Sequence, residues 1–247
     1  MISFVVPAYN EADLIGATLE SLHQAAGAAK GTPSDGDHPE PYEIIVADDG
    51  SNDETAVIAE RHGARVVKVA HRQIAATRNS GARETRGEFL IFVDADTIVN
   101  ATVVRGAVDA MRHGAVGGGA GITFDGAVPL YAEVMTALLV RAFRATGLAA
   151  GCFLFCTRAG FEAVGGFDEQ YFGGEEIIMS RALKRQGRFV ILTHAVTTSG
   201  RKLRTHSARE MWGGLAAVAL RGLRGVKQRQ GMDLWYAPRR RDPKKND

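Results

Sequence analysis

The chain has 247 residues, 45% of them hydrophobic and 23% charged, a composition that fits one large α/β domain or one domain with a modest appendage. Lys and Arg total 30 against 28 for Asp and Glu, so the formal net charge is only +2, which excludes a general polyanion binder and argues against a nucleic-acid partner. The positive charge is local, in clusters at residues 201–204 and 239–245 near the carboxyl end.

Short runs of β-branched and aromatic residues alternate with helical patterns through the first half of the chain. We expect strands at residues 2–6, 43–47, 64–69 and 89–93. We expect helices over residues 14–22, 55–61 and 101–112, and one that starts near residue 75. This alternation predicts βαβ units and a mostly parallel sheet flanked by helices.

Glycine-rich segments interrupt this pattern at two places. Residues 27–41, rich in Gly, Pro, Ser and Asp, predict a loop. The glycines of residues 114–119 predict close packing of the backbone or a bend. Nowhere does a strand lead through GxxxxGK[ST] into a helix, which argues against a P-loop ATPase or kinase.

The last part of the chain combines an apolar stretch with basic residues. Residues 215–220 are apolar but too short to span a membrane, and basic residues follow them. This segment is compatible with a helix on an anionic membrane surface, but it favours a helix packed on its own domain with its basic end in water. We expect a domain over residues 1–200 and a helical, basic extension over residues 201–247. With neither signal peptide nor spanning helix in view, we expect a cytoplasmic protein with reduced, buried Cys152 and Cys156, or one held peripherally at the inner face of a membrane.

Two carboxylates, Asp94 and Asp96, follow the apolar run of residues 89–93. A buried strand end is a costly place for unpaired charge, so the pair implies a cation between the carboxylates, and a divalent metal is the simplest one. Alternation along a strand would send both side chains to the same side. The structural alternative is a helix N-cap, with Asp96 or Thr97 opening the next helix.

Polar clusters of this kind occur at four places in the chain. They occupy residues 7–11, 48–53, 75–81 and 94–96, each at a predicted strand end or helix start. Because ligands bind beyond the carboxyl ends of strands in open α/β sheets, we expect the four clusters to form one cleft.

The side chains of these clusters suit a nucleoside diphosphate. Tyr9 can cover a base, and Asp48 or Asp49 can accept a hydrogen bond from a base N–H or a ribose hydroxyl. Arg78 can hold phosphate oxygens bidentately, and a metal on Asp96 would neutralise a leaving diphosphate.

Each of these side chains also fits a structural role when it is taken alone. Asp53 or Ser51 can cap the helix of residues 55–61, Asn10 can cap the helix before it, and Arg78 can form a surface ion pair. Separate structural roles for all four clusters at one sheet edge explain the pattern less well than one shared binding site does.

Several motifs of the chain resemble those of the inverting, nucleotide-sugar-dependent glycosyltransferases of family 2, which have the GT-A fold. The motifs are VVPAYNE at 5–11, VADDGS at 46–51, ATRNSG at 76–81, VDAD at 93–96, GGFDE at 165–169 and GEE at 174–176. They span roughly residues 1–200 in the order found in the family. The resemblance implies a Rossmann-like GT-A sheet and the transfer of a sugar from a nucleotide donor, with a UDP-sugar as first candidate, in bacterial-type cell-envelope or glycoconjugate biosynthesis.

The resemblance also assigns residues. It implies donor contacts from Pro7, Tyr9, Asn10, Glu11, Asp48, Asp49, Arg78, Asp94 and Ala95. It implies Mg²⁺ or Mn²⁺ on Asp96 and Asp94. Many relatives carry a further metal-ligating His after the next strand, and His194 and His206 lie near that place without matching it.

The catalytic base of the family lies in a Glu-Asp pair, where this chain has Glu175 and Glu176. The matched base is Glu176, which is one methylene longer than Asp, with Glu175 as the alternative. Ile178 stands where relatives often have another acidic residue. The Gln-x-x-Arg-Trp signature of processive synthases is missing, so the addition of a single sugar is expected.

Two other functions use similar residues. A sugar-1-phosphate nucleotidyltransferase would share the sheet and the metal site, but it would normally have a Gly-rich basic loop where this chain has residues 7–10. A non-catalytic nucleotide-sugar binder would keep Tyr9, Asp49 and Arg78 without a catalytic base.

Overall fold

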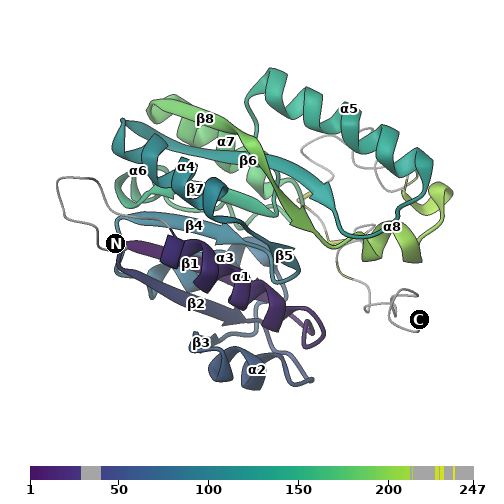
Figure 1. The fold of residues 1–247 in the computed structure, drawn as a ribbon, viewed down its shortest axis with the longest axis horizontal. Helices are drawn as coiled ribbons and strands as arrows, with labels where there is room; N and C mark the ends of the chain where they lie inside the picture. The colour runs from purple at the N-terminus through teal and green to yellow at the C-terminus, as the bar shows by residue number, and fades with distance from the viewer. Residues whose placement is uncertain (29–39, 212, 214–225, 228, 231–235, 237–247) are drawn as a thin grey trace.

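The computed structural model describes residues 1–28, 40–211, 213, 226–227, 229–230 and 236. Its centre is an eight-stranded sheet in the order β3-β2-β1-β4-β7-β6-β8-β5 (Figure 1). The strands are β1 (Ile2–Ala8), β2 (Tyr42–Asp48), β3 (Arg65–Lys68), β4 (Phe89–Val93), β5 (Thr97–Ile98), β6 (Ala115–Phe124), β7 (Phe153–Thr157) and β8 (Arg188–Thr198). Parallel pairs join β1 to β2 and β4, β2 to β3, and β6 to β8, whereas β7 is antiparallel to β4 and β6, and β5 to β8. The predicted mostly parallel sheet is confirmed.

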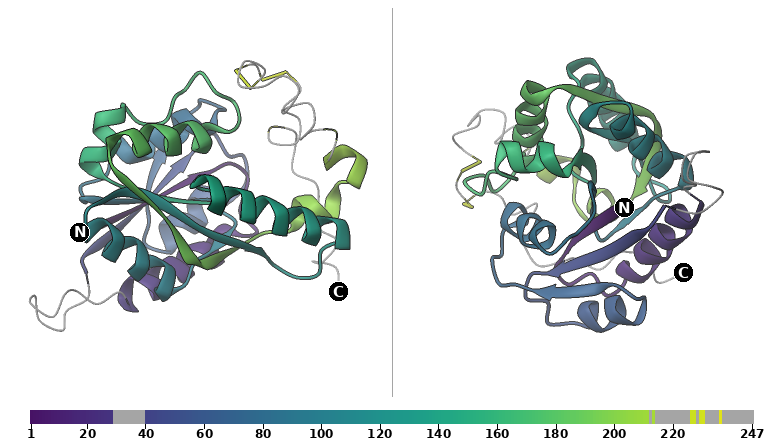
Figure 2. Two further views of the ribbon diagram at one scale, coloured as in Figure 1. Left: turned by 90° about the horizontal axis from the view of Figure 1, so that it is seen from above. Right: turned by 90° about the vertical axis from the view of Figure 1, so that its left-hand side faces the viewer.

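Helices cover both faces of the sheet (Figure 2). They are α1 (Ile15–Ala28), α2 (Thr55–Arg61), α3 (Ile74–Arg83), α4 (Ala101–Arg112), α5 (Leu130–Thr146), α6 (Arg158–Val164), α7 (Glu175–Gln186) and α8 (Arg201–Thr205). One core cluster joins α1 and α4 to one face, and a second joins α3, α6 and α7 to the other. Alternation along β1 explains the two clusters, because Phe4 and Val6 belong to the first and Val5 to the second.

The predicted close packing at the glycine run is also confirmed. Residues 115–124 form β6, which lies between β7 and β8. A Cβ atom at Gly118 would overlap the carbonyl oxygen of Val190 and the ring of Phe155. Glycine therefore allows the neighbouring backbones to approach at this point.

The expectation that Asp96 or Thr97 opens a helix is wrong. Val93 is the last residue of β4, and Asp94 to Thr97 form a turn in which the Thr97 N–H donates to the Asp94 carbonyl at 3.1 Å. Thr97 then starts β5, and α4 begins only after Asn100, whose side chain accepts from the Val103 N–H. Asp94 and Asp96 thus extend beyond the sheet on a turn instead of alternating along a strand.

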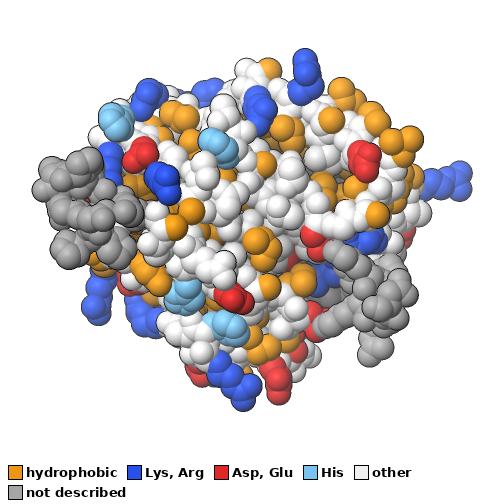
Figure 3. All heavy atoms as spheres, in the orientation of Figure 1, with side chains coloured by type: hydrophobic (Ala, Val, Ile, Leu, Met, Phe, Trp, Pro, Cys, Tyr) orange, Lys and Arg blue, Asp and Glu red, His pale blue; other side chains and the backbone are white. Residues whose placement is uncertain are grey.

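Helix α5 lies at the periphery, and within it Ala132 alone is buried. Leu130, Val134 and Leu138 recur every four residues along it and are 74%, 54% and 61% exposed. Hydrophobic side chains accordingly gather at the upper right of the space-filling view (Figure 3). This helix adds little to the core of the domain.

Cys152 and Cys156 are buried free thiols, as expected. Of the helices in the described ranges, none is both long and apolar enough to cross the bilayer. The apolar segment 215–220 and the basic residues 239–245 lie outside the described residues. The proposed division at residue 200 stays a prediction.

Candidate active site

One cavity opens where the ends of β1, β2 and β4 meet the first turns of α3 and α7. Its wall is built by Pro7, Ala8, Tyr9, Glu11, Asp49, Arg72, Gln73, Ile74, Thr77, Arg78, Asp94, Ala95, Asp96, Gly151, Phe172, Gly174, Glu175, Glu176, Lys202 and Tyr236. All four predicted polar clusters and the Glu pair therefore contribute to one site. Six carboxylates line it against three cationic side chains, which favours the binding of a cation.

Arg78 lies at the centre of the site, on α3. Its Nη1 donates to Glu175 Oε1 at 2.7 Å, and its Nη2 donates to Asp94 Oδ1 and to the Gly151 carbonyl, both at 2.8 Å. The residue is 1% exposed, so the interpretation as a surface ion pair is wrong. Burial alone would lower its pKa, but the charges of Asp94 and Glu175 outweigh burial and raise it.

These contacts change the role expected of Arg78. A guanidinium has five N–H donors, and three hydrogen bonds already tie this one to the protein. Its Nε–H is buried and has no partner. Arg78 therefore joins α3 to the turn after β4 and to α7. Its two Nη groups could bind a diphosphate together only if the hydrogen bond to Asp94 or Glu175 were broken.

The two adjacent glutamates occupy the first turn of α7, where the helix dipole favours negative charge. Glu175 is buried against Arg78, whereas Glu176 forms no ion pair with any described residue. The Glu176 carboxyl lies beside Gly151, since a Cβ added there would be 3.4 Å from Glu176 Cδ. Burial raises the pKa of Glu176 to about 8, the charge of Glu175 adds to this rise, and Arg78 opposes it. Glu176 is thus the carboxylate poised to exchange a proton near neutral pH.

Asp94 and Asp96 face the same cavity from the turn after β4. Asp94 shares one oxygen with Arg78, and Asp96 Oδ1 lies 3.4 Å from Thr198 Oγ1, which donates to it. Within the described part of the chain no three His, Cys, Asp or Glu side chains converge as metal ligands. Mg²⁺ is commonly held by one or two carboxylates together with substrate phosphates, so Asp94 and Asp96 fit a metal that binds with a diphosphate.

Asp49 fastens the end of β2 to the start of α3. Its carboxylate accepts from the Arg72 N–H at 2.8 Å, the Gln73 N–H at 3.1 Å and the Thr77 hydroxyl at 2.9 Å. It lines the cavity and keeps acceptor capacity on Oδ1. Asp48 is buried and accepts from the Ser51 N–H instead, outside the cavity wall.

Tyr9 carries an arginine on its ring. The Arg72 guanidinium carbon lies 3.4 Å from the ring centroid, a close cation–π contact. Arg72 has a φ of +51°, which is unfavourable for a side chain with Cβ and is supported here by its N–H bond to Asp49. Arg72 therefore brings a positive charge over the aromatic ring at the nucleotide side of the predicted site.

Asn10 and Glu11 are anchored from other parts of the chain. The Asn52 N–H donates to Asn10 Oδ1 at 2.9 Å, which ties the turn after β2 to the end of β1 and places Asn10 outside the cavity wall. Glu11 is buried and accepts two bonds from Arg201 Nη2, at 2.8 and 2.9 Å. Asp53 accepts from the Thr55 N–H at the first residue of α2, whereas the N-cap position is Glu54, whose side chain makes no capping bond.

The structure does not bring the two candidate histidines to the cavity. His194 is exposed on β8, and the His206 ring bonds the Lys202 carbonyl. Neither residue lines the cavity wall beside Asp94 and Asp96.

Two motifs that are distant in sequence are held together behind the cavity. Asn79 Nδ2 donates to the Phe167 carbonyl at 2.8 Å, and the Phe167 N–H donates back to Asn79 Oδ1 at 2.9 Å. Gly166, with φ of +80°, leaves room for this amide. The pairing explains why the ATRNSG and GGFDE motifs occur together, because it sets the loop that leads to Glu175 and Glu176 against α3.

Sequence reasoning missed several residues of the wall. Arg72 and Gln73 directly precede a predicted cluster and could have been included with it. Gly151, Phe172 and Tyr236 carry no local signal, because tertiary contacts alone bring them here. Lys202 belongs to the basic cluster of residues 201–204, which the sequence did not connect with the site.

Comparisons with known proteins identify the family to which the chain is similar. A family model described as Glycosyl transferase family 2 matches residues 3–144. Validoxylamine A glucosyltransferase of Streptomyces hygroscopicus subsp. limoneus is 28% identical over 116 residues, 44% of this chain and 23% of that protein. Dolichyl-phosphate beta-glucosyltransferase of Drosophila melanogaster is 36% identical over 104 residues, 38% of this chain and 30% of that protein. The matches span about a quarter to a third of these relatives.

Solved structures share the fold. The mannosyltransferase PcManGT from Pyrobaculum calidifontis, in complex with GDP-Man and Mn²⁺, superposes with a TM-score of 0.64 at 18% identity, over 89% of this chain and 61% of that one. S. aureus TarS 1–349, in complex with UDP-GlcNAc, gives 0.59 at 18% identity, over 90% of this chain and 67% of that one. The predicted GT-A type of α/β fold is confirmed.

Proposed function

This chain belongs to glycosyl transferase family 2, as its motifs predicted, and from that membership we propose that it moves a single sugar from a nucleoside diphosphate sugar to an acceptor hydroxyl. The proposed transfer inverts the anomeric carbon and uses a divalent metal. One observation carries the proposal: Glu176, with a pKa raised to about 8, shares a cavity with Asp94 and Asp96.

Glu176 is the proposed general base. An acceptor oxygen attacks the anomeric carbon as its proton passes to Glu176, while the bond to the diphosphate breaks. Glu175 is a poor candidate because its carboxylate is engaged by Arg78 at 2.7 Å. The contact with Arg78 instead sets Glu175, and through it the first turn of α7, at a fixed distance from Asp94.

Asp94 and Asp96 would hold Mg²⁺ or Mn²⁺ with the diphosphate of the donor. When bound, the metal would neutralise the charge that develops on the leaving nucleoside diphosphate. The excess of carboxylates over cations in the cavity supports this assignment, as does the Mn²⁺ in the complex of PcManGT. The contact with Arg78 at 2.8 Å orients the Asp94 carboxylate for the same purpose.

The donor's nucleotide would lie between Tyr9, Arg72 and Asp49. Asp49 has a lone pair on Oδ1 to accept from a base N–H or ribose hydroxyl, and Arg72 can approach the diphosphate from above Tyr9. We keep UDP-sugars as the first candidates and include GDP-sugars because PcManGT is in complex with GDP-Man. A cytoplasmic location, with peripheral membrane contact through the basic C-terminal region, stays a prediction.

The deciding experiment is a screen of the purified protein against UDP- and GDP-sugars for release of nucleoside diphosphate with and without Mn²⁺. Glu176→Gln should remove the activity and keep donor binding. Glu162→Gln, an exposed position on α6, is the matched control and should behave as wild type. Binding of a nucleotide sugar without any release, by transfer or by hydrolysis, would favour the non-catalytic binder.

A further inference from the structure

Two buried polar atoms of the described residues have no hydrogen-bond partner, and both belong to the cavity wall. They are Nε of Arg78 and the hydroxyl oxygen of Tyr236. Buried polar groups in native proteins are nearly always paired, so unpaired atoms, or orphans, on two residues that line one cavity indicate a partner that the cavity takes up. The coincidence of two such orphans in one cavity points to a ligand that satisfies both.

Tyr236 reaches the cavity from the C-terminal region and is held there by described contacts. Its ring meets the Phe172 ring edge to face, with centroids 6.0 Å apart, and the Arg229 guanidinium lies 5.2 Å from its centroid. The Phe172 N–H donates to the Val226 carbonyl at 2.7 Å. Tyr236 is therefore set against the loop that leads into α7.

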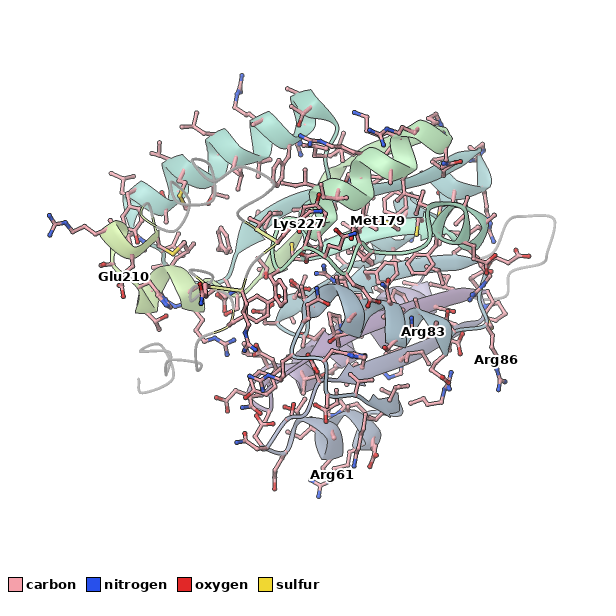
Figure 4. The ribbon with its side chains drawn as sticks, turned by 180° about the vertical axis from the view of Figure 1, so that it is seen from behind. Arg61, Arg83, Arg86, Met179, Glu210 and Lys227 are labelled. Carbon is pink, nitrogen blue, oxygen red and sulfur yellow. The ribbon has the colours of Figure 1, made fainter. Side chains whose placement is uncertain are left out.

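A second contact fixes the same loop. Lys227 Nζ donates to Gln170 Oε1 at 2.7 Å and lies 5.0 Å from the Tyr171 ring (Figure 4, where Lys227 is labelled). Residues 170–172 thus meet Val226, Lys227 and Tyr236 at several points just before Glu175. Two residues of the cavity wall, Lys202 and Tyr236, thus belong to the extension predicted over residues 201–247.

The hydroxyl of Tyr236 is a hydrogen-bond donor at neutral pH. Burial raises its pKa to about 12, the charge of Glu175 adds to this rise, and the Ile74 amide and the cations of Arg78 and Arg229 oppose it. The Ile74 amide does not complete a hydrogen bond with the hydroxyl. Both orphans are thus donors, and the missing ligand must offer acceptor oxygens.

The surroundings of the orphans select the class of ligand. The charge of Glu175 acts on the Tyr236 hydroxyl, so this side of the cavity suits an uncharged group better than a phosphate without a bound cation. A sugar ring is uncharged, presents hydroxyl oxygens as acceptors, and has an apolar C–H face that packs on aromatic rings such as Phe172 and Tyr236.

We propose that Tyr236, supported by Phe172, is a sugar-binding residue, whose hydroxyl donates to an oxygen of the sugar held beside Glu176 while Arg78 Nε donates to a second one. This assignment rests on the proposed transferase function and adds a specific contact to it. The sugar is either the one transferred from the donor or a sugar of the acceptor, and the experiment separates the two.

The test compares Tyr236→Phe, which keeps the ring on Phe172, with Tyr171→Phe, a neighbouring tyrosine outside the cavity wall. In the presence of Mn²⁺, each protein is titrated by calorimetry with UDP, GDP, UDP-glucose, UDP-GlcNAc and GDP-mannose in turn. Methyl glucoside and methyl mannoside are then titrated into the complex with the tighter diphosphate.

Tyr236→Phe should leave the affinity for the diphosphates unchanged. If its hydroxyl binds the transferred sugar, the affinity for the matching nucleotide sugar falls by about 3- to 10-fold, the scale of one neutral hydrogen bond. If the hydroxyl binds a sugar of the acceptor, the affinity for the methyl glycoside falls instead. Tyr171→Phe should match wild type in every arm.

Equal affinities of Tyr236→Phe and wild type in all arms would overturn the sugar-binding role while leaving the transferase function intact. A loss of diphosphate affinity would also overturn it, because the residue would then act on the nucleotide. If wild type binds no nucleotide sugar of the panel, the proposed function fails, and this assignment fails with it.

Discussion

Replacing Arg78 by Met should destabilise the whole domain, because it leaves the buried carboxylate of Glu175 and the part-buried carboxylate of Asp94 without their cation. The Arg78 side chain is 2% exposed, and its ion pairs are 2.7 Å to Glu175 and 2.8 Å to Asp94. Removing one partner of a buried pair costs about 3–5 kcal/mol, a large share of the roughly 5–15 kcal/mol by which domains are stable. At about 2–4 °C per kcal/mol for a domain of this size, the midpoint of thermal unfolding should fall by roughly 6–20 °C.

The assay is thermal and urea unfolding of Arg78→Met beside Arg65→Met. Arg65 pairs with Glu84 on the surface, with the two side chains 45% and 49% exposed, so its loss should cost less than about 1 kcal/mol. The double variant Arg78→Met/Glu175→Gln should recover part of the lost free energy of unfolding, because one of the unpaired charges is removed as well.

The dependence on pH provides a second check. Without the guanidinium, a buried carboxyl group is tolerated better in its protonated form, so part of the stability that the variant loses is regained at low pH and lost again as the pH rises. The difference in the free energy of unfolding between wild type and Arg78→Met should therefore become smaller as the pH falls. An Arg78→Met protein as stable as wild type, with only a higher KM for the donor, would refute the buried role and restore the direct phosphate contact predicted from sequence.

Three further predictions concern the chemistry. Glu176→Gln should lower kcat by roughly 10²-fold or more, the usual scale for a lost general base, whereas Glu175→Gln should mainly lower the unfolding midpoint; a larger kcat loss at Glu175 would reverse the assignment. Since Glu176 acts ionised and its pKa is raised to about 8, kcat/KM of wild type should rise with pH towards a plateau above pH 8, and a flat profile would contradict the role. Asp96→Ala should abolish metal-dependent donor binding, measured by calorimetry with and without Mn²⁺, while far-UV circular dichroism stays unchanged; unaltered turnover would remove the metal assignment.

The first half of the fold could be predicted because its signals are local. Residues 89–93, 55–61 and 101–112 have the bounds found in β4, α2 and α4. The antiparallel β7 and the strand β6 were not identified as strands from the sequence. In β6 the glycines of residues 117–119 remove the side chains on which a strand pattern depends, and strand pairing is a contact between distant residues.

The site could be predicted as a set of residue types, but not as a set of contacts. The sequence identifies Arg78, Asp94 and Glu175. It cannot show that the guanidinium forms its hydrogen bonds with carboxylates that lie 16 and 97 residues away in the sequence. Asp48 and Asp49 are adjacent and chemically equal, and only the turn after β2 decides that Asp49 lines the cavity. Tyr236 has no pattern around it that could have predicted its position.

The family match ends at residue 144, so the proposed base lies outside it. What links Glu176 to the matched part is Arg78, which lies within the match and binds Glu175 across 97 residues of sequence. The same guanidinium holds Asp94, so the carboxylates proposed for the metal and the helix that carries the proposed base are fixed to one rigid group. A change of charge at Arg78, Asp94 or Glu175 should therefore alter donor binding, proton transfer and stability together. For this reason the effect of each substitution on folding has to be measured beside its effect on rate.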